Sequence, residues 1–177
     1  MRQSPRRCAA FTLIELLTVM VIIAILAGMI VAASKYATTK GATARAQAEI
    51  AALETALEQF KNDNGTYPLS TTTRDSGSGN APGQTAINNC VLLYSALAGG
   101  TKVYITFKAD QLAKDSISGK PYIIDPFGAP YNYYYHPPYP PSAPPQNQTA
   151  FDLWSCGPGG TNEPPNSIVS NLTNWKQ

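Results

Sequence analysis

Residues Phe11–Ala33 read FTLIELLTVMVIIAILAGMIVAA, and this stretch decides how the chain folds. It contains one charged residue, Glu15, which is followed by an unbroken uncharged run up to Lys35. At about 1.5 Å per residue a helix over this stretch is about 34 Å long, enough to cross a hydrocarbon core of about 30 Å. The stretch therefore predicts a membrane-spanning helix.

The residues before this stretch, MRQSPRRCAA, carry three arginines and no acid. Positive charge beside a first apolar segment holds that end in the cytoplasm, so we expect the rest of the chain on the outer side of the membrane. A secretory signal peptide begins in the same way, and the small residues at 32–34 leave that alternative open. Against it, the run is longer than a signal-peptide core and contains Glu15, and an acid within a membrane span is by default a functional hypothesis.

The sequence Ala-Phe-Thr-Leu-Ile-Glu-Leu at 10–16 resembles the processing site of type IV prepilins and of the pseudopilins of type II secretion. The resemblance implies that 1–10 is a leader, that a prepilin peptidase cuts between Ala10 and Phe11, and that the new amine of Phe11 is methylated. Glu15 is then the fifth mature residue. Its carboxylate is expected to pair with the Phe11 amine of a neighbouring subunit and so to fix the register of assembly, because an unpaired charge in an apolar environment is costly. The family usually has Gly where this chain has Ala10.

An amphipathic pattern follows the apolar run. Within 34–62 the large apolar residues recur at three- and four-residue spacing, as Ile50, Leu53, Leu57 and Phe60. Such spacing is typical of a helix with one buried face, and no proline interrupts it before Pro68. We therefore expect one helix from about Thr12 to about Asn62, whose second half has an apolar stripe that the rest of the chain must cover.

The remaining residues, 63–177, predict a small domain on this stripe. Gly65 is the expected left-handed cap of the long helix. A second helix is expected at 87–98, strands are expected at 131–136 and 150–155, a third strand near 168–169 or 172–175, and a further strand candidate lies at 103–107. The predicted class is α+β, with a long N-terminal helix packed on a small antiparallel sheet of about three strands.

A second resemblance lies in this domain. Asp125-Pro-Phe-Gly-Ala-Pro-Tyr-Asn-Tyr resembles a core motif of the major pseudopilin of type II secretion, and 126–129 reads as a turn. The resemblance implies a pilin-like fold with a leader (1–10), a membrane and filament-core helix (11–33), its amphipathic continuation (34–62) and a periplasmic domain (63–177).

Charge and motif content argue against several function classes. After removal of 1–10 the chain has ten basic and eleven acidic residues, so no strong basic field favours nucleic acid. His136 is the only histidine and has no nucleophile or carboxylate motif beside it. The tyrosines of 131–139 are interpreted as core and loop packing rather than as a base-stacking surface. We expect neither an enzyme nor a required cofactor.

Two cysteines, Cys90 and Cys156, lie outside the leader. They can form a disulfide in an oxidising periplasm or remain two separate thiols, at least one of them buried. In the family, the loop after the second strand often binds Ca²⁺. The matching region here, 155–175, contains Glu163 and Asn171 but no Asp, so it is at best a weak calcium site.

The resemblance implies a structural subunit of a type II secretion pseudopilus in the bacterial inner membrane. It would be a single-pass protein with a cytoplasmic N-terminus until cleavage. Its partners would be identical or related subunits, the prepilin peptidase, the inner-membrane assembly platform and membrane lipid, with no nucleic acid. Two alternatives remain open: a type IV pilus subunit for adhesion, motility or DNA uptake, and an uncleaved anchor that displays a periplasmic binding module.

Overall fold

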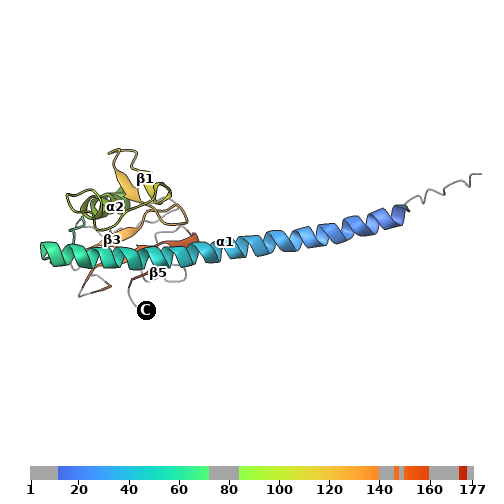
Figure 1. Ribbon diagram of the computed structural model, residues 1–177, viewed down its shortest axis with the longest axis horizontal. Coiled ribbons are helices and arrows are strands. Elements are labelled where there is room, and N and C mark those ends of the chain that lie inside the picture. The colour runs from blue at the N-terminus through green and yellow to red at the C-terminus, as the bar shows by residue number, and fades with distance from the viewer. Residues whose placement is uncertain (1–11, 72–83, 140–145, 148–149, 160–171, 175–177) are drawn as a thin grey trace, which may run out of the picture. The chain divides into compact units, whose positions relative to one another are not determined.

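A computed structural model of the protein describes residues 12–71, 84–139, 146–147, 150–159 and 172–174 (Figure 1). The chain divides into two compact units, Met1–Lys40 and Gly41–Gln177. The long helix α1, Leu13–Asn64, begins in the first unit and ends in the second.

The part of α1 in the first unit is apolar and exposed over its described side chains. The side chains at 12–30 and 34–40 are all exposed. An eighteen-residue window of α1 has a mean hydropathy of 2.9, and none of it is buried, so the helix is long and apolar enough by length and composition to cross a membrane. Exposed apolar surface of this extent indicates that an apolar environment outside the chain surrounds this segment.

The part of α1 in the second unit has the predicted apolar stripe. Its buried side chains are Ala46, Ile50, Leu53, Ala56 and Leu57. The helix ends at Asn64, two residues beyond the predicted end, and Gly65 follows with φ +79°. The Gly65 N–H donates a hydrogen bond to the Lys61 carbonyl at 2.7 Å, so the predicted left-handed cap is confirmed.

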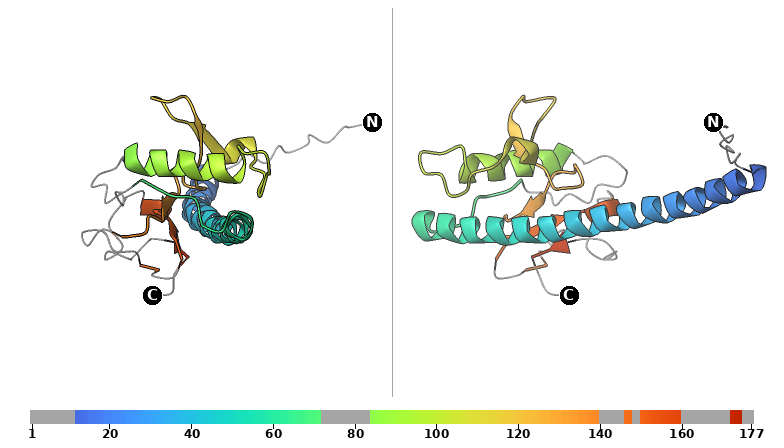
Figure 2. Two further views of the ribbon diagram at one scale, coloured as in Figure 1. Left: turned by 90° about the vertical axis from the view of Figure 1, so that its left-hand side faces the viewer. Right: turned by 45° about the vertical axis from the view of Figure 1, so that its right-hand side comes forward.

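Helix α2, Gln84–Leu97, covers the core from another side (Figure 2). It was expected at 87–98 and begins three residues earlier. Cys90, Leu93 and Leu97 are fully buried and belong to the same apolar cluster as the α1 stripe. The strand β3, Asn132–Tyr134, lies between α2 and the second part of α1 in Figures 1 and 2.

A three-stranded antiparallel sheet has the order β3-β4-β5, with β4 at Asp152–Ser155 and β5 at Leu172–Thr173. Asn132 pairs with Trp154, which pairs in turn with Thr173. The expected α+β class and the sheet of three strands are therefore confirmed. Of the two positions expected for the third strand, the one at 172–175 is found, and 168–169 lies outside the described residues.

The tyrosines of the aromatic segment pack in the core, as expected. Tyr131, Tyr133 and Tyr134 are buried, and the Tyr133 hydroxyl donates to the Pro68 carbonyl at 2.7 Å. The turn at 126–129 is also confirmed. Asp125 accepts backbone hydrogen bonds from Phe127 and Ala129, and Gly128 has φ +88°.

The strand expected at 103–107 is wrong. These residues form no strand, and Val103 is 56% exposed. Tyr104, Ile105 and Phe107 instead pack against the core as loop side chains. A short 3₁₀ turn, Ala109–Gln111, then leads into an unpredicted antiparallel hairpin of β1, Leu112–Lys114, and β2, Pro121–Ile123.

Asp115 holds the turn of this hairpin. Its carboxylate accepts hydrogen bonds from the Ile117 and Ser118 backbone N–H groups, from the Ser118 hydroxyl and from the Gln84 side chain on α2. These donors, with the Ser118 hydroxyl first, lower the pKa of Asp115 to about 2. Hydrogen bonds to the carboxylate therefore hold this turn. Apolar burial does not, because the Ile117 side chain is 77% exposed.

This arrangement predicts an acid-sensitive fold. Because the folded-state pKa of Asp115 is depressed, the stability it supplies is present above the unfolded pKa of 3.8 and is lost as pH falls toward about 2. Urea unfolding of the full chain in detergent, measured from pH 5 to pH 2, should show this loss. Asp115→Asn should be less stable at pH 5 and depend less on pH, and Ser118→Ala should move the loss to higher pH. An acid limb that is identical in all three proteins contradicts the assignment.

Candidate functional site

The first turn of α1 carries the acid that the sequence singled out. Thr12 precedes the helix, and its hydroxyl accepts a hydrogen bond from the Glu15 N–H at 3.3 Å. The Glu15 Oε2 atom accepts in return from the Thr12 N–H at 3.4 Å and from the Thr12 hydroxyl at 3.2 Å. This reciprocal arrangement is a capping box, in which a Thr and an acid three residues later satisfy each other's free donors.

The capping box gives Glu15 a defined place at the start of an apolar helix. The carboxylate is directed back toward Thr12, and the positive end of the helix dipole favours a negative charge there. The arrangement therefore reduces the cost of one acid in an apolar segment before any partner arrives. The predicted cleavage and methylation residues, Ala10 and Phe11, lie outside the described residues, so the cleavage point stays a prediction.

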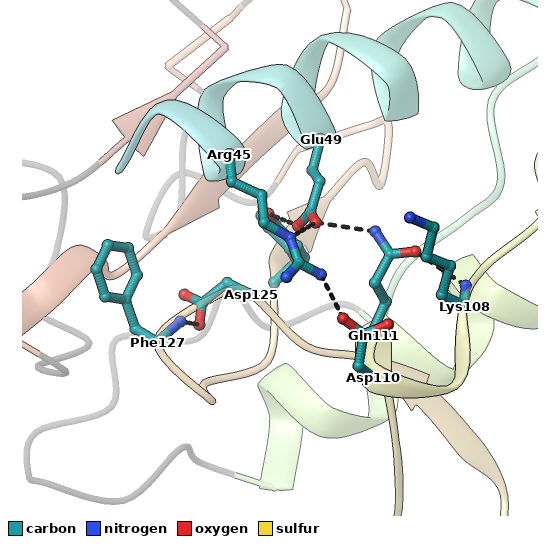
Figure 3. A network of polar contacts seen from close by, with 8 residues as sticks. Arg45, Glu49, Lys108, Asp110, Gln111, Asp125 and Phe127 are labelled. Carbon is teal, nitrogen blue, oxygen red and sulfur yellow. Dashed lines mark hydrogen bonds and ion pairs between the residues drawn. The ribbon is translucent and has the colours of Figure 1, made fainter. Parts of the chain in front are cut away.

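A second polar centre gathers around Glu49 on the second part of α1 (Figure 3). One Glu49 oxygen accepts from the Arg45 guanidinium at 2.8 Å and from the Gln111 amide at 2.8 Å, and the other accepts from the Tyr131 hydroxyl at 2.7 Å. Arg45 also pairs with Asp110 at 3.0 Å. Glu49 therefore joins α1 to the segment before β1 and to the segment before β3.

Burial and charge both act on the groups of this centre. The Glu49 side chain is only 14% exposed, and burial, followed by the hydrogen bond to Glu49, raises the pKa of Tyr131 far above its usual value. Burial also raises the pKa of Asp125, although its donors, first the Ser155 hydroxyl at 2.6 Å, oppose this shift. These shifts favour neutral, hydrogen-bonded groups around one stabilised carboxylate, which is the pattern of a structural tie.

The two cysteines are buried, and no disulfide joins them. The Cys90 thiol donates to the Ile123 carbonyl at 3.1 Å, and burial raises its pKa to about 12. Cys156 accepts from the Asn132 side chain at 3.3 Å. Of the two alternatives left open by the sequence, the structure has the separate thiols, and so high a thiol pKa makes Cys90 a poor nucleophile at neutral pH.

No metal site stands out in the part of the chain that the structure describes. There, no three His, Cys, Asp or Glu residues gather closely enough to hold a metal ion. The weak calcium candidates, Glu163 and Asn171, lie outside the described residues. A pocket between α1 and the segment 105–107 has a cavity volume of about 40 Å³ and is lined by Leu53, Phe107 and Tyr131 among others. This is far below the several hundred cubic ångströms of a usual ligand site. A second, open hollow of about 460 Å³ lies beside the Glu49 centre and is lined by Ala48, Ala52 and Lys108 among others.

The sequence patterns identified Glu15, but its capping box and the separate Glu49 centre were not predicted. The Thr-x-x-Glu spacing at 12–15 is the signature of a capping box and was available in the sequence. The Glu49 centre had only a faint local signal, the spacing of Arg45 and Glu49 by one helical turn. Its other donors lie far along the chain, so no local pattern predicts them.

Comparison with known proteins supports the resemblance. Residues 5–31 match the prokaryotic N-terminal methylation motif. The chain is also similar to the type II secretion system core protein G of Aeromonas hydrophila, at 41% identity over 63 residues. That alignment covers 36% of this chain and 44% of the relative, so the chain spans less than half of the relative's length. Together these similarities support a pseudopilin-like family, and with the apolar helix they fit a membrane-anchored protein.

The Glu49 centre generates a test of stability. Tyr131→Phe removes one donor to a carboxylate that is largely shielded from water, so we expect a loss of about 1.5–3 kcal/mol in the free energy of unfolding. Urea denaturation of the full chain in detergent measures it. Tyr94→Phe is the matched control, because it keeps the ring contact with Phe107 and should change stability by less than about 0.5 kcal/mol. Equal effects of both substitutions would show that the Glu49 tie contributes nothing specific.

Proposed function

We propose that this chain is a structural subunit of a type II secretion pseudopilus. A prepilin peptidase removes residues 1–10, the amine of Phe11 is methylated, and α1 then packs against the same helix of other subunits. The observation that carries the proposal is the match of residues 5–31 to the N-terminal methylation motif, because that match falls on an apolar helix with a single capped acid, Glu15.

The choice of secretion over a pilus is supported by the relative. Its name places it in a type II secretion system, and it is 41% identical to this chain over 63 aligned residues. The motif Asp125-Pro-Phe-Gly-Ala adds support through its resemblance to the major pseudopilin, and the buried Asp125 carboxylate holds its turn. The alternative is a pilus subunit. Genomic context decides between the two: neighbouring secretion genes support the pseudopilus, and pilus retraction genes support the pilus.

The proposed orientation follows from charge. Arg2, Arg6 and Arg7 hold the N-terminus in the cytoplasm, so the globular part, 63–177, lies in the periplasm. The partners proposed for the chain are therefore the peptidase, the inner-membrane assembly platform, membrane lipid and related subunits. The role is mechanical: assembly is non-covalent, needs no cofactor, and makes the chain a substrate of enzymes rather than an enzyme.

Mass spectrometry of the protein from membranes tests the processing step. We expect a mature chain that begins with N-methyl-Phe11 and lacks residues 1–10. Phe11 follows Ala10 rather than Gly, so Ala10→Gly is the matched variant and should be processed at least as completely. An intact Met1 in the wild-type protein supports the uncleaved anchor instead, and a chain cut after residues 32–34 supports a secretory signal peptide.

Substitution of Glu15 tests the assembly step. Glu15→Gln keeps an acceptor for the capping box but removes the charge, so we expect normal processing and at least roughly tenfold fewer filaments, because the Phe11 amine of the neighbour is left without its counter-charge. Glu15→Val removes the cap as well and should assemble no better. Filaments are counted by microscopy, and processing is checked by mass. Normal filament numbers with Glu15→Gln would refute the charge-pairing role.

A further inference from the structure

Charge is segregated along α1 beyond its apolar run. No acid occurs between Leu16 and Ala48, where the charged residues are Lys35, Lys40 and Arg45. No base occurs between Ala46 and Phe60, where the charged residues are Glu49, Glu54 and Glu58. A helix that stabilised itself would mix these charges at spacings of three or four residues. Apart from the pairs Arg45 with Glu49 and Glu58 with Lys61, the charges are separated along the helix, which leaves charged side chains that a partner could meet.

Within the globular unit, one residue of each charged group forms an ion pair. Arg45 and Glu49 pair with each other and with residues of the globular unit, so they are not available to a partner. Lys35 and Lys40 are exposed, and neither belongs to an ion pair within the described part of the chain. The Lys40 ammonium lies 5.6 Å from the centre of the Tyr36 ring.

The two remaining acids repel each other. Glu54 and Glu58 are four residues apart, a spacing at which like charges destabilise a helix. Glu58 is exposed and accepts a hydrogen bond from the Tyr67 hydroxyl at 2.6 Å. Burial, and in smaller part the charge of Glu58, raises the pKa of Glu54. The hydrogen bond of Glu54 with the Asn174 side chain and the positive charge of Lys61 near Glu58 offset part of this repulsion, and a cation from another copy would offset more of it.

We propose that these four residues form ion pairs between copies of the chain, Lys40 with Glu58 and Lys35 with Glu54 of another copy. The proposal rests on the proposed function, in which the copies lie parallel because each spans the membrane in the same orientation before assembly. Copies in register would place like charges side by side. A displacement of eighteen or nineteen residues, about 27–29 Å along a helix, satisfies both pairs at once.

The surface between the charged groups permits this approach. Most exposed residues of α1 in this region are small, namely Ala44, Ala48, Ala51, Ala52 and Thr55, and the larger exposed ones are Arg45 and Gln47. The distance between packed helices depends on the side chains at the contact, so small residues let a neighbouring helix come close. The charged pairs then lie at the edge of a close contact rather than across open water.

This neighbour differs from the one that meets Glu15. Pairing of Glu15 with the Phe11 amine displaces two copies by about four residues, or about 6 Å. In a helical array each subunit has several neighbours at different axial displacements. The pairs of Lys35 and Lys40 therefore fix a longer-range register, and the two contacts together restrict both rise and rotation.

A charge exchange in the full chain tests the proposal. Lys40→Glu and Glu58→Lys should each reduce filament assembly roughly fivefold, since an exposed attraction becomes a repulsion, and the double variant should recover to within about twofold of wild type. Mass spectrometry of the N-terminus and urea unfolding confirm that each variant is processed and folded. A double variant that assembles no better than the single variants overturns the proposal.

A cysteine pair supplies an independent measurement. Lys40→Cys with Glu58→Cys should give a ladder of disulfide-linked subunits on oxidation, because the two positions in one copy are about 27 Å apart and only different copies can meet. Lys40→Cys with Ala51→Cys is the matched control and should give at least fivefold less. Equal ladders, or none in assembled filaments, overturn the inference alone. A wild-type chain that forms no filaments overturns the proposed function, and this inference with it.

Discussion

The globular unit depends on the burial of one stripe of α1. Ile50, Leu53 and Leu57 lose nearly all contact with water, and α2 and the aromatic strand β3 cover them. Full burial of such a side chain contributes about 1.5–3 kcal/mol, which far exceeds what an exposed ion pair contributes. The helix continues into a segment where the same kind of side chain has no cover, so one element meets two different surroundings. The start of the apolar stripe separates the part of α1 that the globular unit buries from the part that stays exposed.

Carboxylates rather than disulfides tie the peripheral segments to this core. Glu49, Asp115 and Asp125 each accept several hydrogen bonds from hydroxyl, amide or backbone groups. The pKa values of Asp115 and Asp125 move in different directions because the balance of burial and donors differs: exposed donors dominate at Asp115, and burial dominates at Asp125. Burial raises the pKa of Asp125 and so disfavours its ionised form, while the hydrogen bonds from the Ser155 hydroxyl and from the turn oppose that cost. Such ties are directional, and they place loops that apolar packing alone would leave undefined.

Local sequence patterns predicted the helices, caps and strands that depend on interactions between residues close in sequence. The spacing of apolar residues gave α1 and its stripe, Gly65 gave the cap, and the turn before the tyrosines gave β3. The segment 101–120 failed because its apolar residues, Tyr104, Ile105 and Phe107, serve the core from a loop, while the β1–β2 hairpin is held by polar groups around Asp115. Glu15 was predictable from composition, and its capping box from spacing. The Glu49 centre was not, because Gln111 and Tyr131 reach it only after the chain has folded.

Weak contacts are suited to setting register in a filament that must assemble and come apart. A charge pair in an apolar setting, such as the one proposed for Glu15, is costly to break because each partner would be left unpaired. The exposed pairs proposed along α1 contribute only about 0.2–1 kcal/mol each, and salt screens them. Their value lies in repetition, because every subunit adds the same pairs and a wrong displacement replaces them all with repulsions. Strength would then come from the apolar helix, and specificity from charges that contribute little to any single contact.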